Sequence, residues 1–412
     1  MPKATLIRNV RIIDGVSDKP IEGKAVLVVG ERIQRIGAEN ELLNASDTPA
    51  KPDMVDGGGS TLIPGLINAH EHLTWRRTPG SWTDRVVSRA PSWFIARGAG
   101  HALLSIKEGV TTVRDVGAKE DSAVVLRDAI EAGILVGPRI RSCRQTISMT
   151  GGHAYETSVV ADGADGMRQA VREQVLLGAD FIKLMASGGA VAKNRDFPWS
   201  PQFTDEELRA AFDEAHRQDR LTTVHCHPAL QIRAAVEAGV DCIEHGALID
   251  EPTAAFLAER NIPLVPTLAA KESFLVHGEQ YNRDPESIEK IRRDRPATIG
   301  KWRKIRDTGV RLIAGVDSLG DLNLELSLFV EIGMTPHQAI ASATSHAAEA
   351  IGMKDQVGSL EAGKFADMVL VKGDPLQDIE RLRDITWVMK GGRLFDPATL
   401  TSAMGERISQ PV

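Results

Sequence analysis

Eight short runs of β-branched and apolar residues alternate with longer amphipathic runs from about residue 60 onward. This alternation is typical of βα units, which build a parallel sheet. Eight such units predict an α/β fold with a (β/α)₈ TIM-like barrel, whose functional residues lie at the C-terminal ends of the strands. The expected strands lie at 61–72, 110–117, 138–143, 180–187, 221–227, 241–246, 263–268 and 311–318.

The two ends of the chain lack this pattern. Short strand-like pieces lie at 5–13, 24–30, 32–37, 366–373 and 385–395. Neither end can bury a core alone, so we expect both to pair into one small β-sandwich domain. The predicted domains are residues 1–62 and 356–412 for this sandwich and 63–355 for the barrel. One barrel helix is expected at 204–219, where Thr204 and Glu207 form a capping-box signature.

Composition narrows the classes of partner and location. The 49 basic and 56 acidic residues give a net charge of −7, which does not favour nucleic acid or an anionic membrane as partner. No stretch approaches the roughly 18 apolar residues of a membrane span, and MPKATLIRNVRIID has no apolar signal-peptide core. The 3 cysteines have irregular spacing, which argues against a disulfide framework. We expect a cytoplasmic protein.

Polar residues of an unusual kind gather at the predicted strand ends. In an extended strand His70 and His72 share one face and Glu71 points the other way, which makes Glu71 a poor catalytic candidate. Imidazole nitrogens and carboxylate oxygens are common zinc ligands, and a barrel mouth brings distant strand ends together. The sequence therefore predicts a metal centre. The residues at these ends are His70, His72, Lys183, His225, His227, His245 and Asp317.

Lys183 is unexpected in this set because it lies within the apolar run FIKLMAS. An ammonium about 4 Å from a divalent ion would be repelled by roughly 8 kcal/mol at an effective dielectric near 20. Either the side chain extends its amine to solvent, or the neutral amine has reacted with CO₂ to form a carbamate. A carbamate, Asp317 and a bridging hydroxide would nearly balance the charge of two Zn²⁺ ions. This balance favours the carbamate and a hydrolytic site with two metal ions.

Several motifs together resemble those of a known family. They are LIPGLINAHEH, GVTTVRDVG, GADFIKLMASGG, TVHCHP, GVDCIEHG, IAGVDS and GSLEAGKFADMVLVKGDP, and they extend over nearly the whole chain. In these motifs the chain resembles the binuclear, prolidase-like and ochratoxinase-like branch of the amidohydrolase superfamily, which is related to imidazolonepropionase. Members of this branch hydrolyse dipeptides, N-acyl amino acids and amide mycotoxins such as ochratoxin A.

The resemblance implies two divalent metal ions, and the donor set favours Zn²⁺. It also implies a small-molecule amide or peptide-like substrate and a homo-oligomer. The implied ligands are His70 and His72 for the more buried ion, His225 and His245 for the more exposed ion, carboxylated Lys183 as the bridge, and Asp317 on the buried ion.

The chemistry of these parts predicts a mechanism. A hydroxide that bridges the metal ions attacks the amide carbon, and Asp317 moves its proton to the leaving nitrogen. By resemblance, His153 would bond to the substrate carbonyl or to the tetrahedral oxyanion. His227 shares the face of His225 but lies further out, and related peptidases often have tyrosine there. We expect His227 to contact the substrate.

Other residues near the predicted mouth have open roles. The tryptophans Trp75, Trp82, Trp93 and Trp199 either anchor long loops or form a wall that accepts an apolar or aromatic acyl group. The stretch 271–296 is either a lid or an oligomer contact. The basic candidates for pairing with a substrate carboxylate are Arg76, Arg77, Arg144, Lys193 and Arg195. The histidines interpreted as structural are His101, His216, His277, His337 and His346.

Two classes of alternative compete with peptide-like amide hydrolysis. One is another reaction on the same scaffold: cyclic-amide opening, phenylurea hydrolysis or deamination. Deaminases of this scaffold usually work without a bridging lysine, so Lys183 argues against them. The other is a non-catalytic scaffold protein, which would have lost ligands, yet all of the implied ligand positions are filled.

Overall fold

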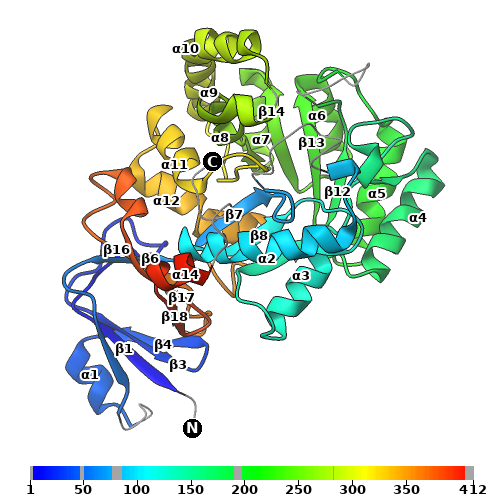
Figure 1. Ribbon diagram of the computed structural model, residues 1–412. Helices are drawn as coiled ribbons and strands as arrows, with labels where there is room; N and C mark the ends of the chain where they lie inside the picture. The colour runs from blue at the N-terminus through cyan, green and yellow to red at the C-terminus, as the bar shows by residue number, and fades with distance from the viewer. Residues whose placement is uncertain (1–2, 47–50, 77–85, 190–196, 282, 404–412) are drawn as a thin grey trace.

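The computed structural model describes residues 3–46, 51–76, 86–189, 197–281 and 283–403 (Figure 1). It has an α/β architecture, which confirms the expected class. Figure 1 shows a group of strands from both ends of the chain beside a larger body of strands and helices.

Two sheets make up the first group. Antiparallel pairing of β16 with β6 joins a C-terminal strand to an N-terminal one. Apolar side chains from both sheets share one core, for example Val26, Leu62 and Met389. The first sheet contains, in spatial order, β4 (Arg32–Gly37), β3 (Ala25–Val29), β1 (Ala4–Arg8) and β5 (Asp53–Asp56). The second contains β18 (Arg393–Phe395), β17 (Ile385–Lys390), β16 (Met368–Val371), β6 (Thr61–Pro64) and β2 (Arg11–Ile12).

The expected single strand at 61–72 is wrong, because the chain divides at Gly65. Residues 61–64 form β6 of the small sheet, and β7 (Leu66–Glu71) begins the parallel strands. The Gly65 N–H donates to Asp367 O at 2.9 Å, and a Cβ at this position would lie 2.1 Å from Thr111 Oγ1. Only glycine permits this close approach of the backbone to the neighbouring strand.

The larger body contains parallel strands, and every pair in its two sheets runs in the same direction. One sheet has the order β7, β8 (Val110–Asp115) and β9 (Arg139–Ser142). The other has the order β11 (Val159–Val160), β10 (Ile147–Ser148), β12 (Ile182–Met185), β13 (Thr222–Pro228), β14 (Cys242–Leu248) and β15 (Leu264–Val265).

Backbone contacts join these two sheets at both ends. The N–H of Asp180, just before β12, donates to Ser142 O of β9 at 2.7 Å. On the other side Leu312 forms a parallel bridge with Leu264 of β15, and Asp317 forms one with Glu71 of β7. The expected strand at 311–318 is therefore present only as these bridges. Together the contacts form a circuit that returns to β7.

Helices connect most of the successive parallel strands, as Figure 1 shows; β9, β10 and β11 follow one another without an α-helix between them. The capping box expected at Thr204 and Glu207 is confirmed at the start of α5. The stretch expected to be a lid or an oligomer contact is mostly helical. The helices are α1 (Glu39–Asn44), α2 (Pro91–Lys107), α3 (Ser122–Glu131), α4 (Gly163–Leu176), α5 (Asp205–His216), α6 (Ala229–Glu237), α7 (Glu251–Glu259), α8 (Leu268–Glu272), α9 (Phe274–His277), α10 (Pro285–Asp307), α11 (Leu322–Glu331), α12 (Pro336–Ser342), α13 (Ser345–Ala350) and α14 (Pro397–Ala403).

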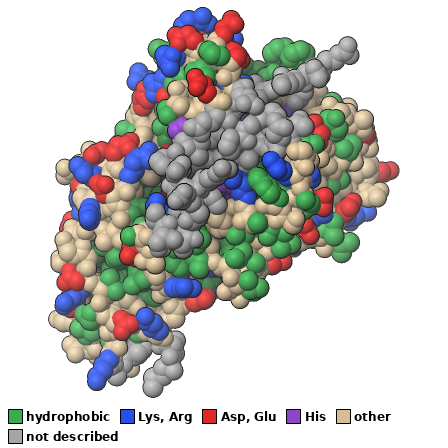
Figure 2. All heavy atoms as spheres, viewed as in Figure 1, with side chains coloured by type: hydrophobic (Ala, Val, Ile, Leu, Met, Phe, Trp, Pro, Cys, Tyr) green, Lys and Arg blue, Asp and Glu red, His purple; other side chains and the backbone are tan. Residues whose placement is uncertain are grey.

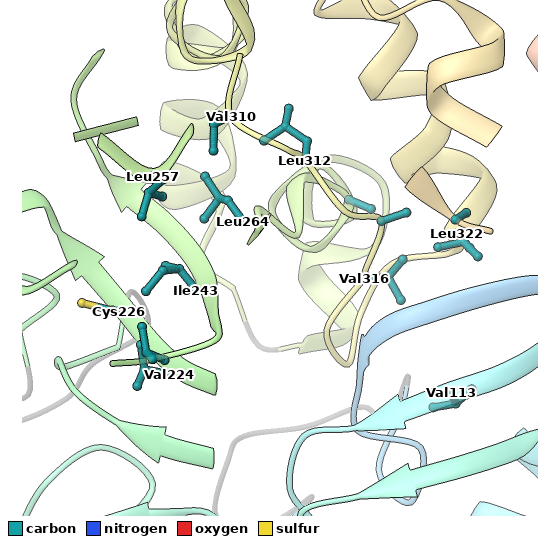
Figure 3. Close-up of a cluster of buried hydrophobic side chains, with 14 of the residues drawn as sticks. Val113, Val224, Cys226, Ile243, Leu257, Leu264, Val310, Leu312, Val316 and Leu322 are labelled. Carbon is teal, nitrogen blue, oxygen red and sulfur yellow. The ribbon is translucent and has the colours of Figure 1, made fainter. Parts of the chain in front are cut away.

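Strand alternation separates the apolar core from the candidate site. Val224 and Cys226 of β13 are completely buried in the apolar cluster shown in Figure 3, together with Ile243 of β14. Because successive side chains of a strand point to opposite faces, His225 and His227 lie on the other face of β13. The core thus fixes which way these imidazoles point.

The surface carries charges of both signs. Acidic and basic side chains are interspersed over the face shown in Figure 2. Among the helices of the described ranges, none is both long and apolar enough to cross a bilayer.

Candidate metal centre

Four of the predicted ligand imidazoles form one continuous cluster. The ring centroids of His70 and His245 lie 4.7 Å apart, and those of His245 and His225 lie 4.6 Å apart. His72 extends the cluster, with its ring centroid 5.7 Å from that of His70. These rings come from β7, β13 and β14, so the strand circuit brings together residues that are far apart in the sequence. Burial lowers the pKa of all four imidazoles, which keeps them neutral as metal ligands must be.

His70 is held by a buried carboxylate. Its Nδ1 lies 2.7 Å from Glu244 Oε2, and Arg114 donates to Glu244 Oε1 at 2.6 Å. Burial alone would raise the pKa of Glu244, but Arg114, Lys183 and His70 together hold it below its usual range. An ionised carboxylate only accepts hydrogen bonds, so Nδ1 carries the proton and Nε2 of His70 keeps its lone pair for a metal ion.

His72 is held by the backbone and by an aromatic ring. Its Nδ1 donates to Gly117 O at 2.6 Å, which again leaves Nε2 as the donor atom for a metal ion. Trp75 stacks on the imidazole at 4.8 Å between ring centroids. Burial lowers the pKa of His72 to about 4, against the opposing effect of Asp317.

The remaining two imidazoles have neutral partners. His245 Nδ1 lies 2.8 Å from Thr267 Oγ1, and His225 Nε2 lies 3.3 Å from Gly188 O. These contacts occupy Nδ1 of His245 and Nε2 of His225, so the opposite ring nitrogens are the ones that would hold a metal ion. His245 has φ 71°, outside the extended range, so simple alternation along β14 does not determine where its side chain points.

Lys183 is fully buried, with 2% of its surface exposed. Its neighbours Ile182 and Leu184 belong to the same apolar cluster as Val224 and Cys226. Because side chains alternate along a strand, Lys183 points to the opposite face, which carries the imidazoles. The proximity is also seen in the electrostatics, because Lys183 lowers the pKa of each of the four imidazoles described above. The first alternative for this residue, an amine extended to solvent, is therefore wrong.

Burial also changes the chemistry of the Lys183 amine. Desolvation lowers its pKa, and Arg114 lowers it further, against the effect of Glu244. A lowered pKa increases the fraction of neutral amine, which is the form that reacts with CO₂.

Asp317 completes the donor set. Its carboxylate lies 3.7 Å from His72 Nε2, and its side chain is 30% exposed. Donor atoms of His70, His245 and Asp317 all lie within 4.8 Å of one another. This spacing brings donors of both predicted ligand groups close together, and the imidazole and carboxylate donors fit zinc. The backbone N–H of Asp317 donates to His70 O at 2.9 Å, which fixes the two residues relative to each other.

His153 and His227 lie beside the cluster. His153 stacks on His225 at 4.5 Å between centroids, and a Cβ at Gly189 would lie 2.1 Å from its ring. The ring centroid of His227 lies 4.6 Å from that of His225, and its Nδ1 accepts from the Ala247 N–H at 3.4 Å. Both rings therefore border the predicted ligands from the side of β13.

The candidates for other roles divide clearly. Glu71 faces away from the imidazoles and pairs with buried Arg76 at 3.1 Å, as expected for Glu71. Arg76 also pairs with Glu108 at 2.7 Å, so it is not placed to bind a substrate carboxylate. Arg144 donates to Gln145. Arg77, Lys193, Arg195 and Trp82 lie outside the described residues.

The tryptophans also differ from one another. Trp75 is buried between His72 and Phe94, so it anchors its segment. Trp93 packs edge-on against Phe94. Trp199 is 62% exposed and stacks on Phe197 at 4.8 Å. The histidines interpreted as structural lie on helices: His101 on α2, His216 on α5, His277 on α9, His337 on α12 and His346 on α13.

Several residues that support the site were missed from the sequence. Glu244 directly precedes His245 in IEHG, and Arg114 lies in the apolar strand TTVRD. A charged residue within a buried strand was the signal that identified Lys183, and it applies equally to these two. Thr267 carries no such signal, because its role depends on a backbone turn.

Comparisons of sequence and of structure both find hydrolases of one family. A model of the Amidohydrolase family matches residues 61–395. Ochratoxinase of Aspergillus niger is 30% identical over 437 residues, which cover 95% of this chain and 87% of that protein. The crystal structure of a Xaa-Pro dipeptidase with bound methionine in the active site has a TM-score of 0.83 and 32% identity, covering 96% of this chain and 100% of that chain. A prolidase complexed with N-methylphosphonate-L-proline has a TM-score of 0.85 and 28% identity with the same coverage.

Proposed function

Because the chain belongs to the amidohydrolase family, in its ochratoxinase-like branch, and is a hydrolase of amide bonds, we propose that it cleaves peptide-like or N-acyl amino acid bonds with the help of two metal ions. The observation that carries this proposal is the convergence of four neutral imidazoles on the buried amine of Lys183. An unmodified ammonium at this position would repel a divalent metal ion held by the same imidazoles.

Lys183 is proposed to carry a carbamate. The neutral amine nitrogen attacks the carbon of CO₂, a C–N bond forms, and one proton leaves to solvent, which produces a monoanion with two oxygens. The lowered pKa of Lys183 supports the first step. The anion would replace a positive charge in the middle of the cluster by a negative one, which the donor chemistry of a divalent metal requires.

The metal ions are proposed to divide the ligands between them. When bound, two divalent cations, Zn²⁺ by the match of donors, would polarise the scissile carbonyl and make a water molecule acidic. The ligands of the more buried ion would be His70, His72 and Asp317, those of the more exposed ion would be His225 and His245, and the Lys183 carbamate would join both.

Asp317 is proposed to move the proton. Its side chain is 30% exposed, more than that of His72 at 14%, so it can face both water and substrate. It takes a proton from the attacking water and gives it to the departing nitrogen. This transfer is needed because an amide anion is a very poor leaving group.

His153 and His227 are proposed to hold the substrate. Because Nδ1 of His227 accepts a backbone hydrogen bond, its proton lies on Nε2 in the neutral ring, and this edge can donate to a substrate carboxylate. His153, stacked on His225, can donate to the carbonyl oxygen that becomes negative during attack.

The wider architecture belongs to the same proposal. The circuit of parallel strands supports a (β/α)₈ barrel at 63–355, and the two small sheets support a β-sandwich of 1–62 and 356–412. The family resemblance supports a homo-oligomer. A cytoplasmic location is proposed from the composition, and the free, buried cysteines Cys143, Cys226 and Cys242 are consistent with a reducing compartment.

A hydrolysis screen tests the proposal. The protein is expressed with zinc and bicarbonate and assayed with Xaa-Pro dipeptides, N-acyl amino acids and ochratoxin A. We expect the protein to release a free amino acid from at least one of these substrates, and the Asp317→Asn variant to release none. Release of ammonia, or turnover only of cyclic amides or phenylureas, would contradict the proposed substrate class. Absence of any turnover with no bound metal would favour a scaffold protein.

A further inference from the structure

Glu325 is a fully buried carboxyl group outside the predicted ligand set. It lies on α11 and accepts hydrogen bonds from two successive backbone groups, the N–H of Leu268 at 3.1 Å and the N–H of Ala269 at 2.6 Å. These are the first two residues of α8. A carboxyl group in an apolar interior is costly, and burial raises the pKa of Glu325 to about 8. A residue retained at such a cost indicates a specific task.

The residue before these two amides is strained. Thr267 has φ 50° and ψ 47°, the left-handed region, which a β-branched side chain rarely adopts. Such residues persist only where the surroundings determine them strongly, and they gather at functional sites. The Thr267 hydroxyl is the partner of His245 Nδ1 at 2.8 Å, so the strained residue contacts a candidate ligand.

The hydrogen bonds of Glu325 constrain the backbone torsion ψ of Thr267. The Leu268 N–H belongs to the peptide plane that begins at the Thr267 carbonyl, so a hydrogen bond to this N–H fixes ψ of Thr267. The second bond, to Ala269, fixes the next plane. Glu325 thereby holds Thr267 in the conformation that directs its hydroxyl toward His245.

His245 depends on this support more than His70 and His72 depend on theirs. His70 has a charged carboxylate partner, and His72 has the carbonyl of Gly117. Nδ1 of His245 meets a neutral hydroxyl, on a residue whose backbone is strained, and His245 itself has a positive φ of 71°. Loss of the Thr267 conformation would therefore affect the more exposed metal position first.

We propose that Glu325 is a positioning residue that sets the affinity of the more exposed metal position, acting through Thr267 on His245. This inference rests on the proposed binuclear site. Glu325 would thus influence metal affinity from α11, although it contacts no metal ion itself.

The experiment measures zinc binding rather than turnover. Apoprotein is titrated with Zn²⁺ against a chelating indicator, and Co²⁺ is used in parallel for its absorption spectrum. We expect Glu325→Gln and Thr267→Val to weaken the weaker of two sites about 10- to 100-fold and leave the stronger site unchanged. Glu214→Gln, a matched change of another nearly buried glutamate on α5, should alter neither site.

Two threonine variants separate positioning from packing. Thr267→Ser keeps the hydroxyl and loses a methyl group, whereas Thr267→Val keeps the shape and loses the hydroxyl. Positioning predicts that Ser retains the weaker site and Val loses it, and a packing role predicts the reverse. These variants also serve if Glu325→Gln does not fold.

The outcomes distinguish this inference from the function on which it rests. If the wild-type protein binds no second metal ion, the proposed binuclear function fails. If it binds two, and Glu325→Gln and Thr267→Val bind both with unchanged affinity and an unchanged Co²⁺ spectrum, only the role of Glu325 is overturned.

Discussion

Glu244 lies 2.7 Å from Nδ1 of His70, and both side chains are almost completely buried. The same carboxylate accepts a hydrogen bond from Arg114, so one residue connects a candidate metal ligand to a buried cation. This relationship fixes the tautomer of His70 and increases the basicity of its free nitrogen. It also makes Glu244 the most sensitive supporting residue of the buried metal position.

Glu244→Gln should therefore weaken the buried metal position about 10- to 100-fold. It should also cost about 3–5 kcal/mol in the free energy of unfolding, because Arg114 loses its buried partner. Chelator competition and denaturant unfolding measure the two effects. Glu71→Gln is the matched control, since Glu71 pairs with buried Arg76 but faces away from the imidazoles. A stability loss in Glu71→Gln with unchanged zinc affinity is expected, and equal zinc affinity in both variants would contradict the role of Glu244.

Lys183→Ala should abolish stable binding of the metal pair and leave a folded protein. Removing the side chain takes away the protein group proposed to bridge the two ions, while the surrounding apolar core is retained. Metal analysis and circular dichroism measure the outcome. Lys301→Ala is the control, because Lys301 is a partly buried lysine on α10 whose pKa burial also lowers. Full metal content in Lys183→Ala would exclude the bridging carbamate.

Asp317→Asn should separate metal binding from turnover. The amide oxygen can still donate a lone pair to a metal ion, but it cannot accept and return a proton at neutral pH. We expect most of the metal to remain and kcat to fall about 100- to 10,000-fold. Steady-state kinetics on the best substrate of the screen, with metal content measured on the same sample, checks this. Unchanged kcat would remove Asp317 as the proton carrier.

Glu325 should make stability depend on pH. Its pKa is about 8 in the folded protein, against an ordinary value of 4.5, so between these values the folded state binds the additional proton. Stability from this group is therefore present below pH 4.5 and is lost as the pH rises toward 8, by at most about 1.4 kcal/mol per pH unit. Unfolding of wild type and Glu325→Gln from pH 5 to 9 measures the difference. Parallel curves would show that Glu325 does not titrate in this range.

Trp199 should contribute to substrate preference. With Phe197 it forms an exposed stacked pair, and Pro201, two residues further, forms a bridge with Ser187, two residues after β12 ends. Trp199→Ala should lower kcat/KM for aromatic acyl substrates roughly 2- to 10-fold and leave small aliphatic ones unchanged. Leu176→Ala, which changes an exposed apolar residue on α4, is the control. An equal loss for both substrate classes would contradict this role.

The sequence was sufficient to predict which residues meet. The histidine pairs, Lys183 and Asp317 stand at the ends of runs with clear strand character, and parallel strands necessarily bring such ends to one side. It was not sufficient where the backbone leaves a regular strand. The break at Gly65 depends on the close approach of Thr111, which no local pattern contains.

The supporting residues show the same limit. Glu244 reaches His70 across 174 positions of sequence, and alternation along β14 fails at His245 because of its positive φ. A pattern of period two describes strands but not the torsions at their ends, which is where this site lies. Residues that act through a turn, such as Thr267, are found only from the structure.

The central claim is a binuclear centre bridged by carboxylated Lys183, and zinc-edge anomalous diffraction from crystals grown with zinc and bicarbonate tests it most directly. We predict two anomalous peaks, one beside His70 and His72 and one beside His225 and His245, with density for a planar CO₂-derived group on Lys183 Nζ between them. A single peak, or two peaks with an unmodified Lys183 amine, would contradict the account.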